Sequence, residues 1–309
     1  MEDKKILFES ITGSVSYNTD IITSDVDKKF VYIQHPESIL GFKYVEQINV
    51  NKDYVGYEIR RFIQLLKSGN PSLLEMLFTD DRFILHKDPV FDLLIENRHM
   101  FITKKIKNAF IGMTVQNIKK SKIKNMFDLA FVITLDGKEM PLNDFLKLNG
   151  YDINNLGLFC EDYENKSSFP LYYKKTKLYK GIVSEIGGIY SSYIPKGETP
   201  VGYLFFQGVR NVVDDNGLLV DGKSLMHAKR ILGSLEELID TGSMKVYRDN
   251  RKELIDIRNG NVDHIELIDE LEKRIRRLDG EIDRLNIPDQ VDEEFAHKLL
   301  IEIRNKINW

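Results

Sequence analysis

The chain has 309 residues and a formal net charge of −4, with 42% hydrophobic and 30% charged residues. This length suffices for two domains of ordinary size, and the composition excludes disordered and fibrous classes. No apolar run reaches the length of a membrane span, and the charged N-terminus lacks the apolar segment of a secretion signal, so we expect a cytoplasmic protein without a membrane partner. One cysteine and six histidines offer no internal disulfide and no zinc-binding spacing. A metal ion would therefore be a hard cation held by carboxylates.

The first 123 residues predict a small mixed α/β unit. Short apolar runs bounded by turn residues predict three strands, over residues 5–11, 26–33 and 45–57, the last interrupted near Asn51. Helical spacing and Asn-Pro or Pro signals predict the helices behind them, over residues 59–66, 71–77, 89–96 and 101–123.

Periodicity is weakest in the middle of the chain, over residues 124–221. We expect short strands there, over residues 129–135, 178–186 and 201–206, with turns at Asp136 and at Pro195 to Gly197. The rest of the chain predicts helices, over residues 223–242, 251–258, 262–285 and 292–307. The predicted fold class is α+β, with three domains: a core with a small mixed sheet (1–123), a β-rich inserted segment (124–221) and a helical C-terminal domain (222–309).

The most informative residues are Gly13 and Ser14, followed after ten positions by Asp25 and Asp27. Side chains two apart on a strand lie on one face, so these carboxylates would stand side by side. Acids with this spacing are often only solvated residues of a loop. Two carboxylates this close repel each other, and a divalent cation such as Mg²⁺ or Mn²⁺ would relieve that repulsion and also bind phosphate oxygens. Gly13 lets a phosphate approach the backbone, and the Ser14 hydroxyl can donate to it. The pattern predicts in-line attack on a nucleotide phosphate.

Taken whole, the pattern of apolar strand, Gly-Ser, ten residues, Asp-Val-Asp and apolar strand resembles the DNA polymerase beta superfamily of nucleotidyltransferases. It is more similar still to the RlaP-like group, which comprises phage and bacterial predicted nucleotidyltransferases assigned to RNA repair. Matching residues occur along nearly the whole chain and are fewest over 124–221: Tyr17, Ser24, Asp53, Tyr57, Arg60, Arg61, Phe62, Asn70, Pro71, Leu74, Glu75, Phe101, Lys104, Lys105, Gln116, Lys223, Met226, His227, Arg230, Leu232, Arg248, Glu253, Leu254, Ile257, Arg258 and Gly260. Asn18 and Phe30 depart from the group, which usually has glycine at both positions.

The resemblance implies a third carboxylate on an adjacent strand. Asp53 is the candidate for this position, with Glu58 as the alternative. Such an acid would orient the attacking hydroxyl or complete the shell of a metal ion. The simpler interpretation of Asp53 is a turn acid. The resemblance also places Ser24 at the nucleotide, whereas Glu75 is interpreted as a helix-surface acid or a partner of Arg61.

Three basic side chains recur on one face of the predicted helix 223–242, namely Lys223, His227 and Arg230. Apolar residues occupy the opposite face. We expect the basic face to be open and to neutralise a triphosphate, the alternative being an ordinary solvated surface.

Two further basic stretches have open interpretations. Seven lysines and no acid lie between residues 104 and 124, either as a polyanion contact or as a solvated face. A Tyr/Lys stretch at residues 172–180 would stack bases or form an exposed hairpin.

The function that these residues predict is an Mg²⁺-dependent nucleotidyltransferase of the EC 2.7.7 type, which transfers a nucleoside monophosphate from a nucleoside triphosphate (NTP) to an acceptor hydroxyl. The family implies an RNA end as the acceptor. Two alternatives stay open: nucleotidylation of a protein or small molecule, and an inactive module that binds nucleotide or RNA. The base preference and the oligomeric state are not determined by the sequence.

Overall fold

The computed structural model describes residues 3–121 and 219–309 continuously and shorter stretches between them. These stretches are residues 130–134, 136, 138–141, 144, 147–148, 184–186, 189–196, 199–207 and 212–213. The chain forms two compact units, of which the first contains residues 1–118, 226–255 and 268–309 and the second contains residues 119–225 and 256–267. The division into three domains at residues 123 and 221 stays a prediction. Among the helices described, none is long and apolar enough to cross a membrane.

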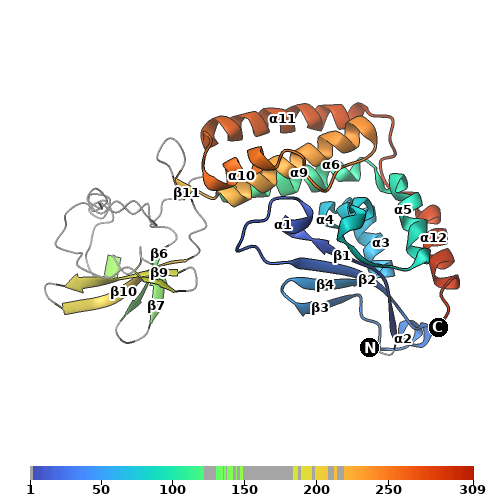
Figure 1. The fold of residues 1–309 in the computed structure, drawn as a ribbon, viewed down its shortest axis with the longest axis horizontal. Helices are drawn as coiled ribbons and strands as arrows, with labels where there is room; N and C mark the ends of the chain where they lie inside the picture. Colours follow the sequence, from blue (N-terminus) through green and yellow to red (C-terminus); the bar gives the residue numbers. More distant parts are fainter. Residues whose placement is uncertain are drawn as a thin grey trace. The chain divides into compact units, whose positions relative to one another are not determined.

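The first unit contains a mixed five-stranded sheet in the order β3-β4-β2-β1-β5 (Figure 1). The strands are β1 (Lys4–Thr12), β2 (Asp27–Gln34), β3 (Gln47–Asn51), β4 (Tyr54–Glu58) and β5 (Ile84–Lys87). Only the β2 and β4 pair is parallel, and the other neighbours are antiparallel. The three predicted strand regions are confirmed, including the interruption after Asn51. The sequence did not predict β5, because its four residues are half-buried or exposed and carry no alternation.

The described α-helices of the N-terminal region are α1 (Gly13–Ser16), α2 (Pro36–Leu40), α3 (Ile59–Lys67), α4 (Pro71–Leu74), α5 (Asp92–Glu96) and α6 (Lys105–Ser121). Three of these, α2, α3 and α4, begin at side-chain caps. The Glu58 carboxylate accepts from the Arg60 amide at the start of α3, and the Asn70 side chain caps α4 in the same way. Stacking of Phe91 on Phe8, with ring centroids 4.4 Å apart, joins the sheet to the segment before α5.

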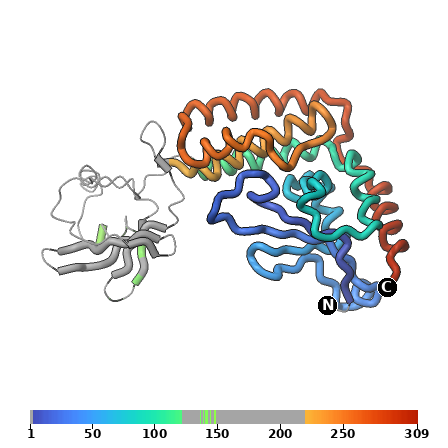
Figure 2. The backbone as a smooth tube through the Cα atoms, viewed as in Figure 1, coloured from blue at the N-terminus to red at the C-terminus, as the bar shows by residue number. Residues whose placement is uncertain are grey.

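Four helices follow the second unit's strands, as predicted to within two residues at each end. They are α9 (Gly222–Thr241), α10 (Arg251–Asn259), α11 (His264–Arg284) and α12 (Glu293–Asn305). Figure 1 shows α6, α9 and α11 side by side, and Lys107 on α6 pairs with Asp279 and Asp283 on α11. The two ends of the chain also lie close together (Figure 2). His35 links them, since its amide donates to the Asp3 carbonyl and its ring lies 5.0 Å from that of Trp309.

Phe30, where the resembling group has glycine, fits because glycine occurs on the neighbouring strand instead. Gly56 on β4 pairs with Phe30 in register. A Cβ atom on Gly56 would lie 2.1 Å from the Phe30 ring, so the ring occupies the space that this glycine leaves. The departure at Phe30 is therefore compensated within the sheet.

The second unit contains an antiparallel sheet in the order β7-β6-β10-β9-β8 and a separate pair of strands, β11 and β12. The strands are β6 (Ala130–Thr134), β7 (Glu139–Pro141), β8 (Ser184–Ile186), β9 (Ile189–Lys196), β10 (Thr199–Gln207), β11 (Val212–Val213) and β12 (Leu219–Val220). The strands predicted at 129–135 and 201–206 are found. The sequence did not predict β9, because Pro195 near its end indicated a turn. The Tyr/Lys stretch 172–180, Lys122, Lys124 and most of the predicted strand 178–186 lie outside the described residues.

Candidate active site

Three candidate acids lie near one edge of the first sheet. Asp25 and Asp27 stand at the start of β2, and Asp53 directly precedes β4. Because β2 and β4 are parallel, their starts lie at the same edge. The Lys28 amide donates to the Asp53 carbonyl at 2.7 Å, which places Asp53 next to Asp27. Glu58, the alternative third acid, lies at the other end of β4, buried and paired with Arg304.

A cation already lies between two of these acids. The Lys52 ammonium is 3.4 Å from Asp25 Oδ2 and 3.5 Å from Asp53 Oδ2. The hydrogen bond to Asp25 raises the pKa of Lys52, and the charges of both acids act in the same direction. The edge therefore attracts positive charge.

The donor atoms suit a hard divalent ion, although the acids are not gathered into a closed cage. Among the described residues, no group of three or more Asp, Glu, His or Cys could hold a metal ion. Mg²⁺ needs only one or two carboxylates, since it keeps several water molecules and takes phosphate oxygens as further ligands. One or two of the candidate acids would be enough for a metal that arrives with a phosphate-bearing substrate, and metal binding by Asp25, Asp27 and Asp53 stays a prediction.

The Gly-Ser turn lies directly against Asp27. Gly13 has a φ of +70°, which favours glycine, and a Cβ atom there would lie 2.1 Å from Asp27 Oδ2. Gly13 is therefore required twice, for its backbone conformation and for the space that the Asp27 carboxylate occupies. Ser14 follows it inside α1 and is half-buried.

Replacing Gly13 with Ala is expected to lower the free energy of unfolding by at least about 1 to 2 kcal/mol, because the left-handed conformation and the contact with Asp27 both oppose a side chain. Urea unfolding measures this. Gly112→Ala is the matched control, since nothing lies within 4 Å of a Cβ at that position in α6. The control should be more stable than the wild type by roughly 0.5 to 1 kcal/mol. A Gly13→Ala protein as stable as the wild type would contradict the close approach to Asp27.

The N-terminal part of the chain matches one family model, described as RlaP: RNA repair pathway DNA polymerase beta family, over residues 1–132. This part of the chain is an RlaP domain. Polymerase beta proteins are typically nucleotidyltransferases and generally use divalent metals. No curated protein and no solved structure matches the chain. The likeness expected for the C-terminal helices lies beyond the matched residues and stays a prediction.

A buried network holds Tyr17, three residues after Ser14 in the RlaP domain. The Tyr17 hydroxyl donates to Glu75 Oε2 at 2.7 Å, and Arg230 on α9 pairs with Glu75 Oε1 at 2.5 Å. The Arg230 guanidinium also lies 3.6 Å from the centroid of the Tyr17 ring. Burial raises the pKa of Tyr17, and the Glu75 charge adds to this effect, so the phenol stays protonated and donates.

Opposite charges alternate around this network. Lys29 lies two residues after Asp27 on the same face of β2. Burial lowers the pKa of Lys29, whereas the charges of Glu75 and Asp27 favour its protonated form. The Arg230 charge acts against the protonated form of Lys29, in the same direction as burial.

The structure corrects two expectations about these residues. The predicted basic face of α9 is not open at Arg230, whose side chain is 5% exposed and paired. Glu75 is not a surface acid: it is buried and has the structural role that the sequence favoured, with Arg230 as the ion-pair partner found in place of Arg61. A phosphate contact by Lys223 or His227, which are half-buried, stays a prediction. Arg230 could make such a contact only in competition with Glu75.

Asn18 and Ser24 shape the main chain between the turn and the acids. Asn18 has a φ of +59°, a conformation that favours glycine or asparagine. Its side-chain amide donates to the Arg248 carbonyl at 3.0 Å, a bond that glycine could not make. The Ser24 hydroxyl accepts from the Ile21 amide at 2.9 Å, so it closes a turn just before Asp25. Nucleotide binding by Ser24 stays a prediction.

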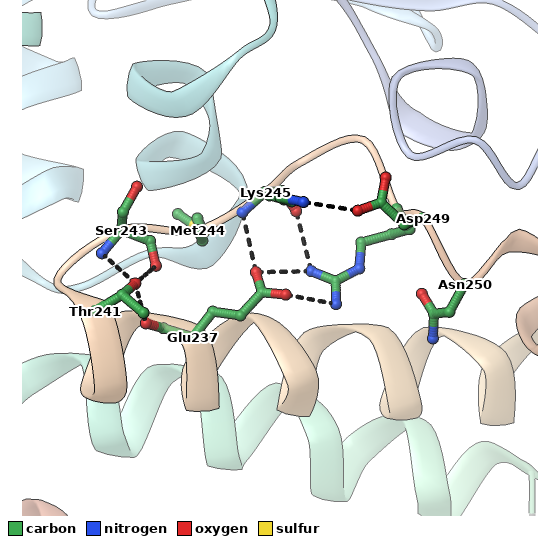
Figure 3. A pocket seen from close by; sticks show the side chains of 8 residues that line it. Glu237, Thr241, Ser243, Met244, Lys245, Asp249 and Asn250 are labelled. Atoms are coloured by element: carbon green, nitrogen blue, oxygen red, sulfur yellow. Dashed lines mark hydrogen bonds and ion pairs between the residues drawn. The ribbon is translucent and has the colours of Figure 1, made fainter.

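A pocket of about 390 Å³ lies after α9 (Figure 3). It is lined by Glu237, Thr241, Ser243, Met244, Lys245, Arg248, Asp249 and Asn250. Figure 3 shows Glu237 bonded to the main chain of Lys245 and to the guanidinium group of the neighbouring arginine, Arg248. Asp25, Asp27 and Asp53 are not among the residues that line this pocket.

The lysine-rich helix is partly neutralised within the first unit. Lys104 pairs with Asp289, and Lys107 pairs with two acids of α11. Lys105, Lys119 and Lys120 are exposed. A polyanion contact is thus left to the exposed lysines and stays a prediction.

Proposed function

We propose that this protein is a divalent-metal-dependent nucleotidyltransferase that transfers a nucleoside monophosphate from an NTP to a hydroxyl of an RNA end and releases pyrophosphate. The observation that supports the proposal is that Asp27 lies against Gly13 at the start of β2, next to the start of β4 after Asp53, within an RlaP domain. Hard oxygen donors beside a backbone turn suit a metal-bound triphosphate.

Each residue of the edge has a role in this reaction. Asp25 and Asp27 would hold Mg²⁺ or Mn²⁺, which neutralises the phosphate charge and makes the acceptor hydroxyl more acidic when bound. The Ser14 hydroxyl donates to a phosphate oxygen, and the absence of a side chain at Gly13 lets the Asp27 carboxylate lie against the turn. Asp53 accepts a hydrogen bond from the attacking hydroxyl and orients it.

The bond changes are those of an in-line displacement. The acceptor oxygen forms a bond to the α-phosphorus, the bond from that phosphorus to the α,β-bridging oxygen breaks, and pyrophosphate carries away the electron pair. The proton of the acceptor hydroxyl passes to the Asp53 carboxylate and then to water.

Binding by the RlaP domain can be tested without knowing the acceptor. NTP with Mg²⁺ is expected to raise the melting temperature, whereas NTP with a chelator is not, because only ligands bound by the folded state stabilise it. An equal shift without metal would contradict the role of the acids.

The acceptor is tested with each α-labelled NTP, Mg²⁺ and RNA whose 3′ end is either free or blocked. Label should appear on free ends, with release of one pyrophosphate per transfer. Label on the protein or on a small molecule would keep the chemistry and replace the RNA acceptor. No pyrophosphate release with any NTP would contradict the proposal.

A further inference from the structure

The segment from Gly13 to Asp20, here called the Gly-Ser turn, connects the end of β1 to the loop before Asp25. Three main-chain hydrogen bonds close it. The amides of Tyr17, Asn18 and Thr19 donate to the carbonyls of Gly13, Val15 and Ser14. These bonds lie within the turn itself, so the position of the whole turn depends on contacts made from outside.

Arg251, the first residue of α10, makes an external contact with two main-chain carbonyls of this turn. Its Nη1 donates to the Asn18 carbonyl at 2.8 Å, and its Nη2 donates to the Asp20 carbonyl at 2.9 Å. Nη1 also lies 3.1 Å from Asp20 Oδ1. A planar guanidinium group suits this two-point contact, because its donors have a fixed spacing.

The stability of α10 does not explain a cation at this position. The first turn of a helix carries the positive end of its dipole, which disfavours Arg. The side chain of Arg251 is 41% exposed, so its ion pair with Asp20 contributes little to stability. What the side chain does provide is a fixed distance between two main-chain carbonyls of the turn.

Neighbouring contacts hold the same turn. The Arg248 amide donates to the Tyr17 carbonyl at 3.3 Å, and the Asn18 side chain returns a bond to the Arg248 carbonyl. Arg248 is itself held by Glu237. The segment between α9 and α10 therefore contacts the turn at Tyr17 and Asn18.

We propose that Arg251 is a positioning residue that pre-orders the Gly-Ser turn for the phosphates of the NTP, an inference that rests on the proposed function. A turn that is ordered before binding loses less conformational entropy when phosphate arrives, so the nucleotide binds more tightly. Arg251 touches neither the nucleotide nor the metal. It acts through the main chain of residues 18–20.

Arg251→Lys tests this, because lysine keeps the charge but cannot bridge both carbonyls with a fixed fork. We expect the Kd and KM for NTP with Mg²⁺ to rise about tenfold, with kcat and the melting temperature nearly unchanged. Hydrogen exchange at the Tyr17 and Thr19 amides should become faster, with or without nucleotide. Arg276→Lys is the matched control, since Arg276 is an exposed residue of α11 near Glu272, and it should change none of these quantities.

Each other result overturns the inference in a recognisable way. Wild-type affinity and unchanged exchange in Arg251→Lys would reject the positioning role and leave the proposed function intact. Faster exchange throughout the chain together with a lower melting temperature would show a purely structural role. A wild-type protein that binds no NTP would reject both the inference and the proposed function.

Discussion

Asp27→Asn is expected to reduce Mg²⁺-dependent pyrophosphate release by on the order of 10³-fold, because a metal contributes several kcal/mol of charge stabilisation in the transition state and each 1.4 kcal/mol is a factor of ten. Asn has the shape of Asp but lacks the charge. The substitution therefore keeps the packing against Gly13 while it removes a metal ligand. Steady-state pyrophosphate release and urea unfolding of the same sample measure the two effects.

Asp25→Asn separates activity from stability more cleanly, because the Asp25 side chain is 67% exposed and pairs with the exposed Lys52. It should lose activity to a similar degree with almost no change in unfolding. Asp269→Asn, at an exposed position of α11, is the control and should keep full activity. Full activity in either Asp25→Asn or Asp27→Asn would contradict the role of the acidic edge.

Glu75→Gln is expected to lower the free energy of unfolding by about 3 to 5 kcal/mol, because it leaves the buried Arg230 without its counter-charge. The amide has one oxygen in place of the two that accept from Tyr17 and Arg230, so the loss includes one hydrogen bond as well as the charge. Urea unfolding followed by intrinsic fluorescence or circular dichroism measures the change.

Two further variants test the cause of this loss. Glu294→Gln removes an exposed acid that pairs with Lys298 on α12, and should change stability by less than about 0.5 kcal/mol. Arg230→Met in the Glu75→Gln background should recover part of the stability, because it removes the unpaired charge. A loss below about 1 kcal/mol in Glu75→Gln would mean that Arg230 finds another partner.

The candidate residues at the front of the site were proposed from a local pattern in the sequence. Gly13, Ser14, Asp25 and Asp27 lie on one stretch of chain, but β2 begins only at Asp27, so the strand period that was expected to place both acids on one face does not extend to Asp25. The sequence alone could not decide whether Asp53 or Glu58 lies near Asp25 and Asp27. That choice depends on the parallel pairing of β2 with β4, which brings the start of β4 to the acids and takes its end away.

The contacts that hold the Gly-Ser turn and Tyr17 in place could not be predicted from local sequence patterns. Arg230 and Glu75 are 155 residues apart, and Arg251 and Asn18 are 233 residues apart. Contacts between remote segments leave no period in the sequence, and a charged residue at helical spacing is the same pattern whether it faces water or a buried acid. The amphipathic pattern of α9 therefore predicted an open face where the structure has a buried ion pair.

By itself, the sequence determined the mixed α/β class of the N-terminal region and the helices after residue 222, because each of these depends on neighbours a few residues away. The tertiary structure alone decided that β5 completes the sheet, that Asn18 can replace glycine by bonding to Arg248, and that Tyr17, Glu75 and Arg230 form one buried network. These features depend on burial and on pairing across the chain. The free energy of such pairing is set by desolvation and geometry, which exist only once the segments have packed.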